Sequence, residues 1–137
     1  MQAMTGAELA GFLRRDFPEV AGDFTLEGEG EALALRLLVQ ARHLRPGGTV
    51  SGPSIFGLAD VAFYLALLSR IGPVALAVTT GASIDFMRKP AAGRDLIARP
   101  RILKLGRVLA VGDVLIWSEG ADEPVARASL TYSIPPR

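Results

Sequence analysis

An aspartate stands in the middle of an apolar segment, at position 60 of SGPSIFGLADVAFYLALLSR, residues 51–70. From Ile55 to Leu68, all residues apart from Asp60 and Gly57 are apolar or aromatic. Because an unpaired charge is costly to bury, we expect Asp60 to be shielded from water and to be paired, protonated or used in chemistry. A structural role is the competing interpretation, in which Asp60 pairs with an Arg or Lys across a subunit interface.

The segment in front of Asp60 is rich in glycine. Residues 47–52 read Gly-Gly-Thr-Val-Ser-Gly and lead directly into the apolar segment, which we predict to be a helix over 54–70. Asp60 therefore lies about two turns inside that helix.

Composition sets limits on the chemistry. The chain has 137 residues, which suits a single domain over 1–137 with one core. It has no cysteine and one histidine, so disulfides, thiolate nucleophiles and multi-histidine metal sites are excluded. We interpret His43, the single histidine, as a surface or strand-edge residue rather than a catalytic one. Half of the residues are hydrophobic, a surplus typical of an oligomer interface.

Charge and targeting signals indicate a cytoplasmic protein. Fifteen basic and fourteen acidic residues nearly cancel, so no global charge favours nucleic acid or an anionic membrane as a partner. The N-terminal segment is amphipathic and lacks the apolar run of a signal peptide. The long apolar segment is interrupted by Asp60 and followed by Arg70, which makes it a poor membrane span.

Periodicity predicts the elements that must position Asp60. Thr5 and Glu8 can form a capping box that starts an N-terminal helix, and Phe17-Pro18 ends it. Pro100 falls inside a strand pattern and predicts an edge or a bulge there. Strands are expected over 24–27, 32–39, 74–87, 96–105, 108–117 and 125–134. A helix that is apolar on all faces, with five or six antiparallel strands, predicts an α+β fold whose sheet wraps around the helix.

The segments GGTVSGPSIFGLADVAFYLALLSR and SIDFMRKPAAGRDLIARPRILKLGRVLAVGDVLI, in this order, resemble the hotdog-fold thioesterases. The nearest resemblance is to the phenylacetic-acid-degradation (PaaI-like) type of acyl-CoA thioesterase. Leu58-Ala59-Asp60 matches the Leu-Ala-Asp of that family, and Phe86-Met87-Arg88 with Pro90 matches its Asn-Phe-Leu-Arg-Pro segment with one insertion. The resemblance implies a hotdog core over 20–134 behind an N-terminal helix in 1–19.

The same resemblance implies roles for three residues. Asp60 would be the catalytic carboxylate, acting as nucleophile or general base on a thioester. Gly52 would offer its backbone N–H to the thioester oxygen, helped by the positive end of the helix. Thr79, with Thr80 beside it, would assist the water. The implied partners are an acyl-CoA substrate and a second copy of the chain, as a homodimer or a dimer of dimers. Coenzyme A is part of the substrate and no further cofactor is implied.

The chain departs from the family pattern at three positions in the loop before the helix. Arg45 stands in place of Asn, Ser51 in place of His, and Pro53 in place of a second Gly. Ser51 can hydrogen-bond a substrate but cannot act as an acid near neutral pH. Arg45 could pair with Asp60 or bind an anionic acyl group, and the sequence leaves both alternatives open.

Other candidates are assigned to substrate binding. Phe56, with Phe63 and Tyr64, could line an acyl tunnel or belong to the core. Basic side chains late in the chain could contact the phosphates of coenzyme A or form a solvated surface; they are Arg88, Lys89, Lys104 and Arg107.

The leading prediction is an acyl-CoA thioesterase that hydrolyses a thioester to a free acid and CoA. The alternative is a catalytically impaired hotdog protein that binds acyl-CoA or an apolar ligand. A hotdog hydratase would need a histidine five residues after the aspartate, where this chain has Leu65. A purely structural subunit is the remaining rival.

Overall fold

The central feature of the computed structural model, which describes residues 2–136, is one helix enclosed by a sheet. Helix α3 (Gly52–Ile71) is apolar around its whole circumference and most of its side chains are buried. It is long and apolar enough to cross a membrane, but 61% of its apolar stretch is buried inside the protein. The surrounding sheet therefore accounts for its apolar character.

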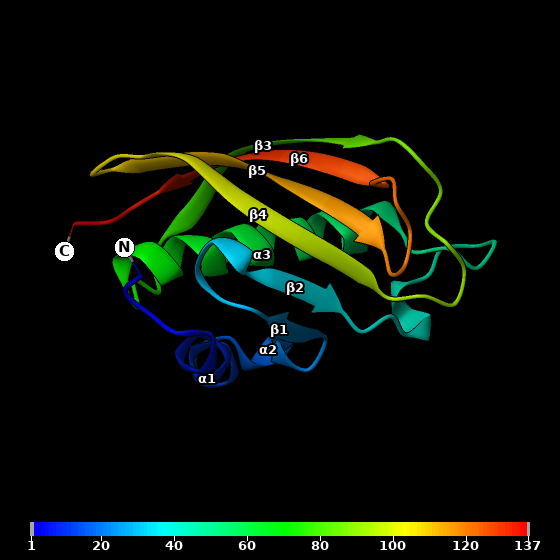
Figure 1. Cartoon of the computed structure of the whole chain (residues 1–137), viewed down its shortest axis with the longest axis horizontal. Helices are drawn as coiled ribbons and strands as arrows, with labels where there is room; N and C mark the ends of the chain where they lie inside the picture. Colours follow the sequence, from blue (N-terminus) through cyan, green and yellow to red (C-terminus); the bar gives the residue numbers. More distant parts are fainter. Residues whose placement is uncertain (1, 137) are drawn as a thin grey trace.

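The sheet is antiparallel, has six strands and follows the order β1-β2-β4-β5-β6-β3. It curves over α3, with β1 and β2 on one side of the helix and β3 and β6 on the other (Figure 1). The strands are β1 (Phe24–Glu27), β2 (Ala34–Leu37), β3 (Val78–Phe86), β4 (Leu96–Leu105), β5 (Leu109–Ser118) and β6 (Ala126–Ser133).

Two short helices precede the sheet and cover its β1 edge. Helix α1 (Gly6–Asp16) begins at Thr5 with the predicted capping box to Glu8, and α2 (Pro18–Ala21) follows it directly. Figure 1 shows both helices beside β1, so this edge is shielded, whereas β3 at the opposite edge pairs with β6 on one side only. Nearly every residue of β3 is exposed.

Close packing between sheet and helix depends on a glycine in β5. A Cβ atom at Gly112 would lie 2.1 Å from the carbonyl oxygen of Arg101 and 2.5 Å from Cε1 of Phe63. Only hydrogen fits at this position, so Gly112 lets the ring of Phe63 on α3 lie directly against the strand.

The predicted wrapped-helix architecture is confirmed. Strand β6 is one residue shorter at each end than predicted, and two other strands are shortened by more. The strand predicted over 32–39 is reduced to β2, Ala34–Leu37. It starts late because a 3-10 helix, η1 (Gly30–Ala32), precedes it, and it ends early because the N–H of Val39 donates to the carboxylate of Asp95. The strand predicted over 74–87 begins at Val78, because the N–H of Ala77 turns back to the carbonyl of Val74.

The prediction for Pro100 is confirmed in a specific way. Strand β4 has β5 on one side and β2 on the other, but β2 pairs with it only over Leu96–Ala98. At Pro100 the β2 side of β4 is therefore an edge. A residue without an N–H is tolerated there. The register irregularity of β4 comes later, between Ile102 and Lys104.

Candidate active site

Two hydroxyl groups converge on one oxygen of Asp60. Thr79 Oγ1 donates to Asp60 Oδ1 at 2.6 Å, and the phenol of Tyr132 donates to the same atom at 2.8 Å. The phenol oxygen also lies 3.1 Å from the backbone carbonyl oxygen of Asp60. Among residues 2–136, no hydrogen bond reaches the other carboxylate oxygen, Oδ2.

Strand register explains why these two hydroxyls meet at Asp60. Thr79 on β3 and Tyr132 on β6 are direct cross-strand partners, so their side chains emerge on the same face of the sheet. That face covers α3. The register then shifts between Thr79 and Gly81, an irregularity of the kind that redirects side chains near active sites.

Asp60 lies at the wall of an open pocket of about 330 Å³. The pocket is lined by Asp16, Phe17, Asp60, Val61, Tyr64, Ala75, Ala77, Val78, Thr79 and Tyr132. The expectation that Asp60 is shielded from water is therefore wrong: its side chain is only partly buried and faces this pocket. The reason is that the sheet covers the helix on the β6 side but leaves the side beyond β3 open.

The phenol of Tyr132 is held as a neutral donor. Burial, and then the negative charge of Asp60, raise its pKa far above the ordinary value. A phenol in this state keeps its proton at neutral pH, so it donates to the carboxylate and does not exchange protons with it. The sequence analysis did not select Tyr132, although its position gave a signal. The other inward positions of β6 are apolar, namely Ala126, Ala128 and Leu130. A tyrosine in that series is expected to be buried, and a buried phenol needs a polar partner.

The glycine-rich loop ends where α3 begins. Gly52 is the first residue of α3, and a Cβ atom there would lie 3.3 Å from Cζ of Phe86 on β3. Ser51 caps the helix, because its hydroxyl accepts from the backbone N–H of Ser54 at 3.3 Å. The structure thus gives Ser51 a local role that its prediction as a substrate-binding residue did not include.

Two other loop residues lie differently from what was expected. Arg45 is exposed, and within residues 2–136 no ion pair joins it to Asp60, so one of its two alternatives, pairing with Asp60, is not formed inside one subunit. His43 is buried, with only 6% of its surface exposed, and the interpretation of a surface residue is wrong. Its Nδ1 accepts from the N–H of Gln40, and its carbonyl accepts from the N–H of Ser51, so it anchors the loop.

The basic residues proposed for phosphate do not form one cluster within a subunit. Arg88 and Lys89 follow the end of β3, whereas Lys104 and Arg107 lie at the hairpin between β4 and β5, at the opposite end of the sheet. The two groups are roughly 20 Å or more apart along the strands.

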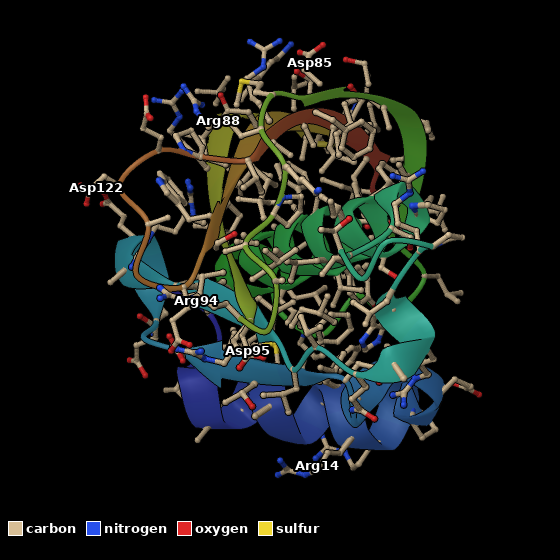
Figure 2. The ribbon with its side chains drawn as sticks, turned by 90° about the vertical axis from the view of Figure 1, so that its right-hand side faces the viewer. Arg14, Asp85, Arg88, Arg94, Asp95 and Asp122 are labelled. Atoms are coloured by element: carbon tan, nitrogen blue, oxygen red, sulfur yellow. The ribbon has the colours of Figure 1, made fainter. Side chains whose placement is uncertain are left out.

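Two acidic side chains lie beside the first of these groups, Arg88 and Lys89. Arg88 lies beside the turn that carries Asp122 (Figure 2) and pairs with Glu123 at 2.9 Å. A pocket of about 310 Å³ lies against Arg88, Lys89, Asp122 and Glu123.

Three aromatic residues of α3 have different surroundings. Phe63 is fully buried and contacts the ring of Tyr132 at a centroid distance of 5.4 Å, so it belongs to the core. Tyr64 lines the pocket, and its hydroxyl donates to the carbonyl of Ala75 at 2.9 Å. Phe56 packs partly buried against the core and is not among the residues that line the pocket of Asp60.

Comparison with known proteins assigns this arrangement to a family. The sequence profile of the thioesterase superfamily matches residues 47–125, which include the glycine-rich segment, α3 and strands β3, β4 and β5. The chain belongs to the thioesterase superfamily.

Solved structures agree with this assignment. A "putative thioesterase" from Silicibacter sp. TM1040 is 54% identical, with a TM-score of 0.92 over 99% of this chain and 95% of that one. A mutant of the phenylacetic acid degradation protein PaaI from Thermus thermophilus is 30% identical, with a TM-score of 0.74 over 86% and 99% of the two chains. A Streptococcus mutans protein bound to acetyl-CoA is 25% identical, with a TM-score of 0.71 over 83% and 90%.

These similarities confirm the predicted hotdog fold and the PaaI-like resemblance of this thioesterase-superfamily protein. Family membership supports a thioester hydrolase. Within residues 2–136 no group of three or more His, Asp or Glu side chains is placed to hold a metal ion. The roles of Asp60, Gly52 and Thr79 remain predictions, which the geometry around Asp60 now makes specific.

Proposed function

We propose that the protein hydrolyses acyl-CoA thioesters to a free acid and CoA, with Asp60 as the catalytic carboxylate. The observation that carries the proposal is the placement of Asp60 at a pocket, with Oδ1 held by two hydroxyls and Oδ2 free of hydrogen bonds from the described residues. The acetyl-CoA bound to the Streptococcus mutans relative supports coenzyme A as the carrier.

In the proposed reaction Asp60 Oδ2 takes a proton from water as the water oxygen attacks the thioester carbonyl carbon. Thr79 assists, because its hydroxyl can accept a hydrogen bond from that water while donating to Oδ1. The carbonyl oxygen becomes negative and is stabilised by the N–H of Gly52 at the start of a helix. Collapse of the tetrahedral intermediate breaks the carbon–sulfur bond, and the CoA thiolate takes up the proton that Asp60 had removed from water.

Helix geometry favours a site that is shared between two subunits. Gly52 and Asp60 are eight residues apart on α3, which separates their backbones by about 12 Å along the axis. One carbonyl group cannot reach both within a single chain. We therefore propose a homodimer in which Asp60 of one subunit faces Gly52 of the other, formed where the free edge of β3 meets its copy. A dimer of dimers would be built from two such pairs.

The first test is hydrolysis over a panel of short, long and aromatic acyl-CoA thioesters, with Asp60→Asn in parallel. Free CoA can be read with a thiol reagent, since the chain has no cysteine of its own. Loss of a general base lowers kcat by roughly 10²–10⁴-fold, and we expect a fall in this range for Asp60→Asn.

Asp113→Asn is the matched control, because Asp113 lies on β5 and pairs with Arg101 at 2.9 Å, away from the pocket of Asp60. We expect it to retain the rate of the original chain. Equal rates for Asp60→Asn and the control would refute the role of Asp60.

The altered loop favours a second candidate function. At two loop positions where the chain departs from the family pattern, Ser51 caps α3, and Arg45 forms no ion pair with Asp60 among residues 2–136. A protein that binds acyl-CoA in calorimetry but releases no CoA from any thioester in the panel would be a binder instead.

A further inference from the structure

We propose that Tyr132 is a positioning residue that, with Thr79, holds Oδ1 of Asp60 so that Oδ2 is the oxygen presented to the substrate. The inference rests on the proposed function and goes beyond it, because it makes the two carboxylate oxygens unequal and assigns a role to a β6 side chain.

The contacts of Tyr132 support this role. Its side chain is buried, with 3% of its surface exposed, and its phenol reaches both Oδ1 and the backbone carbonyl of Asp60, at 2.8 and 3.1 Å. The phenol therefore restrains the helix backbone at position 60 as well as the carboxylate.

Neighbouring rings keep the phenol in place. The ring of Tyr132 lies 5.4 Å from that of Phe63 and 6.1 Å from that of Tyr64, both on α3. Packing of this kind leaves the ring no alternative rotamer without disturbing the core. A donor held on the sheet thus fixes an acceptor held on the helix.

Two donors on Oδ1 have a chemical consequence. An ionised carboxylate accepts several hydrogen bonds, and neutral donors on Oδ1 stabilise its negative charge without supplying a competing positive charge. Free rotation of the carboxylate would exchange Oδ1 and Oδ2, and the pair of hydroxyls opposes that rotation. Catalysis depends steeply on such placement, since a misplacement of about 1 Å can cost 10²-fold in rate.

Tyr132→Phe tests the proposal, because it removes one oxygen and keeps the ring. We expect kcat to fall roughly ten- to a hundredfold, with KM changed by less than about twofold. A merely structural tyrosine would lower the unfolding temperature without this selective fall in kcat.

Thr79 provides a second measurement. Tyr132→Phe and Thr79→Val each remove a donor to the same oxygen. The fold-decrease of kcat in the double variant should therefore differ from the product of the two single fold-decreases. Thr131→Val is the control, since Thr131 precedes Tyr132 on β6 and pairs with Gly81 away from Asp60; it should retain wild-type kcat.

The outcomes separate this proposal from the proposed function. Turnover that depends on Asp60 but stays within about twofold of wild type in Tyr132→Phe overturns the positioning role alone. Absence of turnover in the original chain overturns both. A selective fall in kcat in Tyr132→Phe, with KM nearly unchanged, supports both.

Discussion

At the scale of single residues, the imidazole of His43 shows how the loop before α3 is tied to the rest of the protein. Nδ1 accepts from the N–H of Gln40 at 3.0 Å, and Nε2 lies 3.5 Å from a carboxylate oxygen of Asp23. The carbonyl of His43 accepts from the N–H of Ser51 at 2.8 Å, which fixes the residue that caps α3. Protonation at Nδ1 would place a hydrogen against the Gln40 N–H, so the native contacts need the neutral ring.

This contact predicts a pH dependence of stability. Burial, and then the charge of Arg42, lower the pKa of His43 below its ordinary value of 6.5. The unfolded chain therefore takes up a proton before the folded one, and stability is lost as the pH falls from about 7 through 6.5 towards the lowered pKa. The slope of unfolding free energy in this range should be positive and at most about 1.4 kcal/mol per pH unit.

Urea unfolding of the original chain and of His43→Gln between pH 5.5 and 7 measures this slope. Most carboxyl groups titrate below this range, so their contribution is small. His43→Gln keeps a polar side chain and removes the titration, so its curve should be flatter. Parallel curves for the two proteins would contradict the prediction.

The sequence predicted part of the candidate site at this scale. Asp60 was found because a carboxylate in an apolar helix is conspicuous, and Thr79 because of the family resemblance. Tyr132 was missed because its contact depends on the β3–β6 register, which pairs it with Thr79, 53 positions earlier in the chain (132 − 79). The partial exposure of Asp60 was missed for a similar reason: whether a helix face is covered depends on where the sheet ends.

At the scale of elements, the distance between the sheet and α3 is set by small residues. Gly112→Ala should be strongly destabilising, because its Cβ would overlap the backbone oxygen of Arg101 and the ring of Phe63. Overpacking commonly costs about 1–3 kcal/mol, and we expect the upper end, with a fall in Tm of roughly 10 °C.

Gly57→Ala is the matched control on α3. A Cβ at Gly57 meets no atom within 4 Å, so only the helix preference of alanine acts, and stability should rise by about 0.5–1 kcal/mol. Thermal unfolding should show a lower Tm for Gly112→Ala and a higher Tm for Gly57→Ala than for the original chain. Equal effects would contradict the close approach seen at Gly112.

Element types were predictable from the sequence, whereas some element ends were not. The capping box at Thr5 and the apolar run of α3 are local signals, and both are confirmed. The C-terminal end of β2 depends on a side chain far along the chain, since the N–H of Val39 donates to Asp95, which directly precedes β4. No local pattern contains that information.

At the scale of the whole molecule, the proposed sharing of a site predicts complementation between inactive variants. Asp60→Asn lacks the carboxylate, and Gly52→Pro lacks the N–H that would stabilise the oxyanion. Proline is tolerated at the first position of a helix, and the extended backbone of Ser51 suits a residue that precedes proline.

A heterodimer of the two variants would contain one intact site and one site lacking both groups. Random exchange of subunits makes half of the dimers mixed, so the mixture should regain about a quarter of the wild-type rate per subunit, by counting each group once per site. The measurement is CoA release before and after co-refolding. Gly52→Ala keeps the N–H and is the control. No recovery in a mixture shown to contain heterodimers would mean that each chain builds its own site.

The unpaired side of β3 then has a kinetic consequence. If two edges must meet before Asp60 and Gly52 can share a substrate, a lone subunit is inactive, and the number of working sites depends on mass action. Specific activity would stay constant at high protein concentration and decline on dilution. In the most dilute range the rate would grow with the square of the amount of protein added. The order of the reaction in enzyme, read from a simple dilution series, would thus report whether that edge is occupied.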